Sequence, residues 1–105
     1  MIGHAISKNN IKIRLPLERW VHITFSHPEI DDNEFGKVLE IVNNPNFILK
    51  GDHGELFAIT KELGSRYYFV VIYKEQLESD GFIITAYKTT DAKWLFKRKI
   101  LWKKT

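Results

Sequence analysis

The segment LPLERWVHITFSHPEI, residues 15–30, contains an arginine, two histidines and two carboxylates. A histidine gives or takes a proton near neutral pH, and an arginine matches a phosphate with two parallel N–H donors. On a helix, Arg19, His22 and Ser26 lie on one face. Metal-free RNA cleavage needs such groups: a base for the ribose 2′-OH, a cation for the phosphorane charge and an acid for the leaving 5′-oxygen. A solvated polar face is the alternative interpretation.

Two helices are predicted in the first half of the chain. Pro16 suits a first helical turn, and the pair His27-Pro28 discourages continuation of the first helix. Its apolar stripe is formed by Leu17, Trp20, Val21 and Thr24. Polar residues 31–33 offer N-cap oxygens to a second helix, which NNP at residues 43–45 ends. The stripe of that helix is Phe35, Val38, Leu39 and Val42.

The second half is typical of β-strands. Four β-branched and aromatic runs, NFILKG, ELFAIT, RYYFVVIYKE and GFIITAYK, are separated by the turn-forming segments GDHG, GS and SDG. Consecutive strands with short connections predict an antiparallel meander, with the two helices on one face. We therefore expect an α+β fold of two N-terminal helices on a four-stranded sheet, or a five-stranded one if KRKILWK adds a strand. A chain of 105 residues, 44% of them hydrophobic, predicts one domain over residues 1–105.

Composition excludes several classes of protein. The chain has no cysteine, which excludes disulfides, thiolate zinc sites and cysteine nucleophiles. No apolar run reaches the roughly 20 residues of a membrane span and no secretory signal is recognised, so we expect no membrane partner and a cytoplasmic location. His22, His27 and Glu29 do not have the HExxH spacing of a helical zinc site. Without a phosphate loop, nucleophile elbow or dinucleotide motif, we expect no cofactor and no metal.

The last part of the chain is basic and aromatic. Residues 88–104 hold one acid, Asp91, and interleave aromatic side chains with seven basic residues: Lys88, Lys93, Lys97, Arg98, Lys99, Lys103 and Lys104. Such a segment attracts RNA, because neutralised phosphates release counterions and exposed rings stack on bases. Alternatively, its lysines protect a sheet edge while its tryptophans pack in the core.

The order ERWVHITFSHPEI, a capped helix, NNPNFIL, YYFVVIYK and GFIITAYK resembles the small phage-borne and toxin-system nucleases grouped with barnase, EndoU, the tRNase colicins and RelE. The resemblance covers roughly residues 15–88, and its most specific parts are RWVHI, HPE and TAY. It implies the two-helix, four-stranded fold, with a ribonuclease site on the open face of the sheet. It also implies RNA as substrate and allows for a cognate antitoxin or immunity protein as partner.

The resemblance also assigns residues. It makes His22 the helix-borne catalytic histidine, with Arg19 one turn earlier and His27 in HPE, and it places Thr85 and Tyr87 of TAY on the sheet. Candidates for binding the substrate are Arg66, Lys74, Lys50 and Tyr68. We therefore predict a metal-independent endoribonuclease that works by acid/base transesterification. The alternative is a non-catalytic RNA-binding or protein-interaction module with the same fold.

Overall fold

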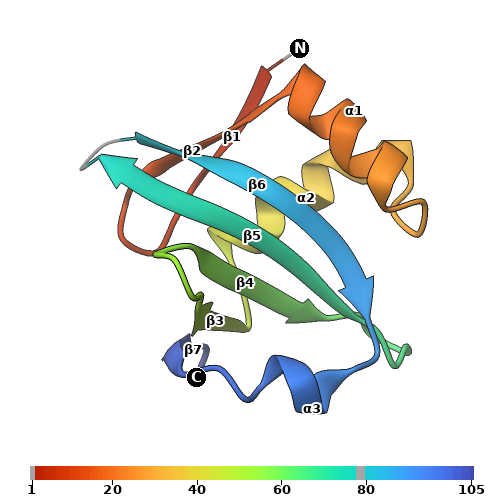
Figure 1. Ribbon diagram of the computed structural model, residues 1–105, viewed down its shortest axis with the longest axis vertical. Helices are drawn as coiled ribbons and strands as arrows, with labels where there is room; N and C mark the ends of the chain where they lie inside the picture. The colour runs from red at the N-terminus through yellow and green to blue at the C-terminus, as the bar shows by residue number, and fades with distance from the viewer. Residues whose placement is uncertain (1, 78–79) are drawn as a thin grey trace.

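A mixed β-sheet forms the centre of the protein in the computed structural model, which describes residues 2–77 and 80–105 (Figure 1). Within this part of the chain the strands are β1 (Ile2–Ile6), β2 (Lys12–Pro16), β3 (Phe47–Lys50), β4 (Leu56–Lys61), β5 (Tyr68–Leu77), β6 (Asp80–Thr89) and β7 (Ile100–Lys103). Their order across the sheet is β1-β2-β6-β5-β4-β3-β7. Neighbouring strands are antiparallel except β2 and β6, which are parallel.

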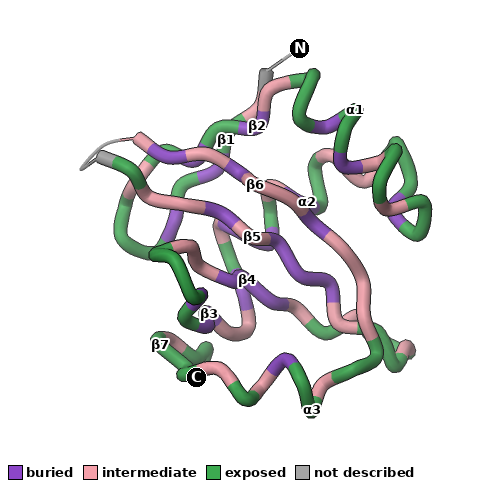
Figure 2. The backbone as a smooth tube through the Cα atoms, viewed as in Figure 1, coloured by how far each residue is buried: buried purple, intermediate pink, exposed green. Residues whose placement is uncertain are grey.

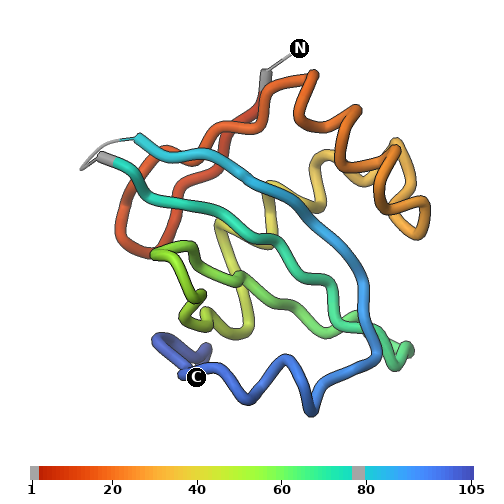
Figure 3. The backbone as a smooth tube through the Cα atoms, viewed as in Figure 1, coloured from red at the N-terminus to blue at the C-terminus, as the bar shows by residue number. Residues whose placement is uncertain are grey.

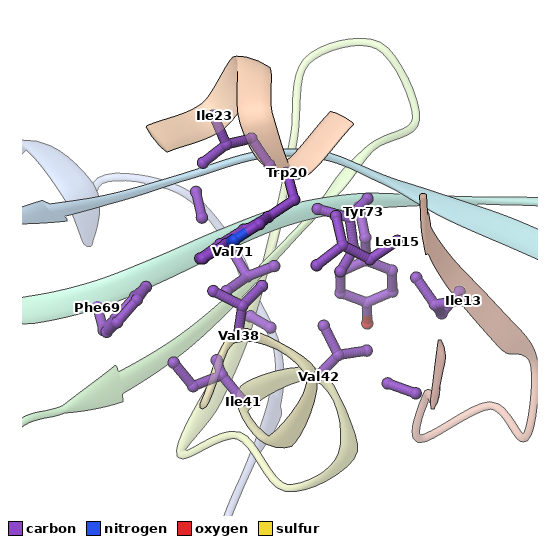
Figure 4. Packing of buried hydrophobic residues seen from close by; sticks show 14 of the residues in the cluster. Ile13, Leu15, Trp20, Ile23, Val38, Ile41, Val42, Phe69, Val71 and Tyr73 are labelled. Carbon is purple, nitrogen blue, oxygen red and sulfur yellow. The ribbon is translucent and has the colours of Figure 1, made fainter. Parts of the chain in front are cut away.

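Two helices cover one face of the sheet. These are α1 (Leu17–Ser26), which follows β2 directly, and α2 (Phe35–Asn43), which follows a 3₁₀ turn η1 (Asp32–Glu34). The N–H of Asp31 donates to the Glu34 carboxylate at 2.9 Å, which closes the start of this second helical segment. Trp20 of α1, Val38 of α2 and Val71 of β5 meet in the core beneath the helices (Figure 4).

The other face carries a second, smaller core. It consists of Leu49, Phe57, Ile59 and Val70 from the sheet together with Leu95 of the short helix α3 (Ala92–Leu95). Buried positions concentrate in the central strands, while the outer elements are largely exposed (Figure 2). The sheet is therefore covered on both faces, by α1 and α2 on one and by α3 on part of the other. None of the helices in the described residues is long and apolar enough to cross a membrane.

The fold predicted from the sequence is wrong. The four runs after Pro45 do form the antiparallel strands β3 to β6, but the sheet has seven strands in the described residues and is mixed. The missed strands β1 and β2 form a hairpin ahead of α1, and β2 pairs with β6 through Lys12↔Asp80. Ile13 and Leu15 are buried at alternating positions of β2, a strand pattern that is overlooked when Pro16 is taken only as a helix start.

The predicted apolar stripe of α1 also needs correction. Trp20 and Ile23 are the buried residues of this helix, whereas Leu17 and Val21 are 48% and 57% exposed. The hydroxyl of Thr24 donates to the carbonyl of Trp20 at 3.1 Å. The helix lies beside β2 and β6, near the end of the sheet, instead of across its middle (Figure 1). Only the side of α1 that carries Trp20 and Ile23 therefore packs in the core.

Candidate active site at the free edge of β6

Strand β6 has an edge that no strand covers over most of its length. The parallel strand β2 pairs only with residues Asp80 to Phe82, so residues 83–89 have no strand neighbour on that side in the described part of the chain. Helix α1 and the turn after it run alongside this edge (Figure 3). The backbone N–H of Lys88 points to this side and donates to Oε2 of Glu29 at 3.4 Å. Polar groups from residues 15–30 therefore face β6 directly.

His27 and Tyr87 meet at one end of this edge. Their ring centroids are 5.9 Å apart and the ring planes are inclined by 31°. Both side chains are half-buried. Burial raises the pKa of the Tyr87 phenol above its ordinary value of 10.0, although nearby Arg98 acts in the opposite direction. The Tyr87 hydroxyl is therefore protonated at neutral pH and can donate a hydrogen bond to a ligand.

Glu29 orients the imidazole of His27. Its Oε2 lies 3.3 Å from Nδ1 of His27. Nε2 is therefore the ring nitrogen that Glu29 leaves open to a substrate. A carboxylate beside one imidazole nitrogen is also the arrangement found around general bases.

Arg19 and His22 lie at the other end of the same edge. They line a hollow with Glu18 and Pro16 on one side and with Phe82 and Ile83 of β6 on the other. Both side chains are exposed to solvent. His22 lies within α1 and His27 is the first residue after it, so the two imidazoles border different stretches of β6, near Ile83 and near Tyr87.

Thr85 lies between these two groups. It pairs with Ile72 across the strands, as Tyr87 does with Val70. Ile72 and Val70 belong to the core under α3, and directly paired residues share a face of the sheet. Thr85 and Tyr87 are therefore both on the face of the sheet that carries the core under α3, although Thr85 does not line the hollow of Arg19 and His22.

The four predicted substrate-binding residues lie elsewhere. Arg66 is exposed in the loop between β4 and β5. Tyr68 packs against Phe96, with a centroid distance of 5.6 Å, within the smaller core. Lys50 lines a separate basic hollow, and Lys74 is half-buried in β5. None of the four lines the hollow beside β6, so the cation available there for a phosphate is Arg19.

The sequence analysis misses the role of Glu29 at this site and the structural role of Lys88 beside it. Glu29 was considered only as a metal ligand, yet it contacts both His27 and the backbone of β6. The signal was its position two residues after His27, across a proline that turns the chain back. The side chain of Lys88 is used in ion pairs with Glu34 and Glu62, at 3.2 and 3.7 Å, on the helix-covered face. Among the described residues, no group of three or more His, Asp or Glu is placed to hold a metal ion.

Comparison of the chain with protein-family models, with curated proteins and with solved structures gave no match. A functional proposal for this protein therefore depends on its own residues and their geometry.

Proposed function

We propose that this protein is a metal-independent endoribonuclease whose active site is the free edge of β6. The observation that carries the proposal is the contact of His27 with Tyr87, with Glu29 at Nδ1 of the same imidazole. Arg19 and His22, from the same helical segment, border the same strand. Two proton carriers, a cation and a protonated phenol thus lie along one edge, and these are kinds of group that transesterification of RNA uses.

The geometry suggests a division of roles. Nε2 of His27 takes the proton from the ribose 2′-OH, and the 2′-oxygen then attacks the adjacent phosphorus. Arg19 stabilises the negative charge that develops on the phosphorane oxygens. Protonated His22 donates its proton to the 5′-oxygen as the P–O5′ bond breaks. The products are a 2′,3′-cyclic phosphate and a free 5′-OH, and the hydroxyls of Thr85 and Tyr87 orient the phosphate or the ribose.

The test is cleavage of purified RNA, followed by mapping of the ends. A positioned acid or base contributes about 10²- to 10⁴-fold in rate, so His27→Ala and His22→Ala should each lose about that much. His4→Ala is the matched control, because His4 is an exposed histidine on β1. Equal activity of all three variants would remove the proposed site.

Glu29→Gln tests the positioning role of the carboxylate. Glutamine keeps the length of the side chain but removes the negative charge that faces Nδ1 of His27, so we expect a loss in kcat with little change in KM. An unchanged kcat would indicate that Glu29 serves only to hold the turn beside the N–H of Lys88.

The alternative proposal is a non-catalytic RNA-binding or protein-interaction module. Both forms of this alternative predict that RNA stays uncut. The RNA-binding form also predicts that RNA is bound, with the same affinity in the histidine variants. The nuclease proposal includes a cytoplasmic location, where cellular RNA is the substrate. It also includes a cognate antitoxin or immunity protein, because a cell that makes such an enzyme needs protection from it.

A further inference from the structure

A basic hollow of about 500 Å³ lies apart from the free edge of β6. It is lined by Lys50 at the end of β3, by Asp52 after that strand, by Trp94 of α3 and by Lys97, Arg98 and Lys99. The N–H of Lys50 donates to the carbonyl of Lys99 at 2.9 Å, and this bond joins the end of β3 to the segment that carries Lys97, Arg98 and Lys99. In Figure 1, α3 and β3 lie at the opposite end of the molecule from α1. No residue in the described part of the chain lines both this hollow and the hollow of Arg19 and His22, so the basic hollow is a second site, although its Arg98 is near enough to Tyr87 to affect the pKa of that phenol.

Arg98 is the structural centre of this hollow. Its guanidinium forms two hydrogen bonds with the Asp52 carboxylate, at 3.0 and 3.2 Å, and lies 4.5 Å from the centre of the Phe57 ring. The hydrogen bonds and the charge of Arg98 lower the pKa of Asp52. Asp52, whose carboxylate is the only one to line the hollow among the residues that the structure describes, is thus ionised and neutralised by Arg98.

The remaining charge of the hollow is positive. Lys50, Lys97 and Lys99 are exposed, and none of them forms an ion pair within residues 2–77 and 80–105. Lys88 differs, since its side chain is only 16% exposed and is paired with two glutamates. Lys97 and Lys99 of the basic segment therefore differ from Lys88, and together with Lys50 of β3 they place three cations without an ion pair in the described residues around one hollow.

Trp94 supplies an aromatic surface among these cations. Its side chain is 49% exposed, and its ring centre lies 5.5 Å from the Arg98 guanidinium. The Asp91 carboxylate accepts the N–H of Trp94 at 3.0 Å, and the neighbouring Leu95 is buried. The backbone of Trp94 is thus anchored while its indole stays accessible, an arrangement typical of a platform for stacking a base.

We infer that this hollow binds a single-stranded segment of RNA, with one base stacked on Trp94 and phosphates next to Lys50, Lys97 and Lys99. The inference takes RNA as the partner from the proposed function, but it needs no cleavage. Single-stranded RNA is favoured over a duplex, because in a duplex both faces of each base are covered by its neighbours. The site would hold the chain of the substrate while the edge of β6 cuts elsewhere along it.

The test uses the full-length protein and a fluorescent oligouridine with 2′-O-methyl sugars, which lacks the nucleophile for transesterification. Stacking on an aromatic ring contributes about 1–3 kcal/mol per base, so Trp94→Ala should weaken binding about 5- to 150-fold, and Trp94→Phe much less. Replacing Lys97 and Lys99 by Gln should reduce the slope of log K against log[salt] by about 1.4, since each phosphate contact contributes about 0.7 for a single strand. Lys93→Gln is the control, because Lys93 is exposed on α3 outside the hollow.

Two results would overturn the inference. One is wild-type affinity in Trp94→Ala with a folded circular-dichroism spectrum. The other is equal binding of an RNA duplex of the same length. Neither result bears on the proposed nuclease, which is judged separately by cleavage of ordinary RNA and by the His27 and His22 variants. Conversely, oligouridine binding that depends on Trp94 in a protein that cuts no RNA would support this site and refute the nuclease proposal.

Discussion

Replacing Lys88 by Met should destabilise the fold strongly for a change at a lysine. The ammonium of Lys88 lies 3.2 Å from Glu34 and 3.7 Å from Glu62, and 5.3 Å from the centre of the Phe69 ring. The side chains of Lys88, Glu34 and Glu62 are only 16%, 16% and 18% exposed. Removing the cation leaves two largely buried carboxylates near each other, with Lys37 still 3.1 Å from Glu62.

The expected magnitude follows from these contacts. A hydrogen bond between charged groups contributes about 1.5–3 kcal/mol. Without Lys88, Glu34 loses its ion-pair partner, whereas Glu62 keeps Lys37. Methionine keeps the apolar length of the side chain over Phe69, which limits the loss from packing. We expect the free energy of unfolding to fall by about 2 kcal/mol and Tm by roughly 10 °C.

Urea unfolding followed by tryptophan fluorescence measures this loss. A double-mutant cycle with Glu34→Gln should give a coupling energy of about 1 kcal/mol or more, because the two residues contact each other directly. Oligouridine binding should not change, since Lys88 lies outside the basic hollow. A loss below about 0.5 kcal/mol with additive single mutants would refute the structural role of this ion pair.

Three other outcomes are expected. Burial opposes ionisation of Glu34, but the Asp31 N–H and Lys88 outweigh it and hold the pKa of Glu34 below its usual 4.5. Thermal unfolding should therefore show that stability declines as the pH falls below about 4.5, and that it declines less steeply in Glu34→Gln. Gly81→Ala should cost about 1–3 kcal/mol in urea unfolding, because its Cβ would crowd the Lys74 carbonyl, whereas Gly36→Ala, with open space around it, should cost nothing. Arg19→Lys keeps the charge but loses the planar fork, so RNA cleavage should fall less than in Arg19→Ala and should persist in EDTA.

Local signals in the sequence were sufficient for many of the elements. Pro16 and His27-Pro28 mark the ends of α1, and Asn44-Pro45 the end of α2. The runs of β-branched and aromatic residues identify the strands β3 to β6. These features depend on neighbours within a few positions along the chain, where propensity and hydrophobic periodicity act.

The pairing of β2 with β6 was not predicted, and it is what creates the candidate site. It joins Lys12 to Asp80 in parallel and stops at Phe82, which leaves the rest of β6 uncovered beside α1. Contacts between residues so far apart in sequence depend on how complete elements pack, and no local pattern encodes them.

The amino-acid sequence alone shows which residue types are available for chemistry: the histidines and arginine of residues 15–30 and the basic and aromatic residues of 88–104. The surroundings of these side chains depend on how the chain folds. The tertiary structure places Glu29 at Nδ1 of His27 and Tyr87 against its ring, and it buries Lys88 between carboxylates while leaving Lys97 exposed. Lys88 and Lys97 have the same side chain, and only folding gives them different burial and different neighbouring charges. Burial and neighbouring charge determine whether a charged group stabilises the fold or is free to bind a ligand.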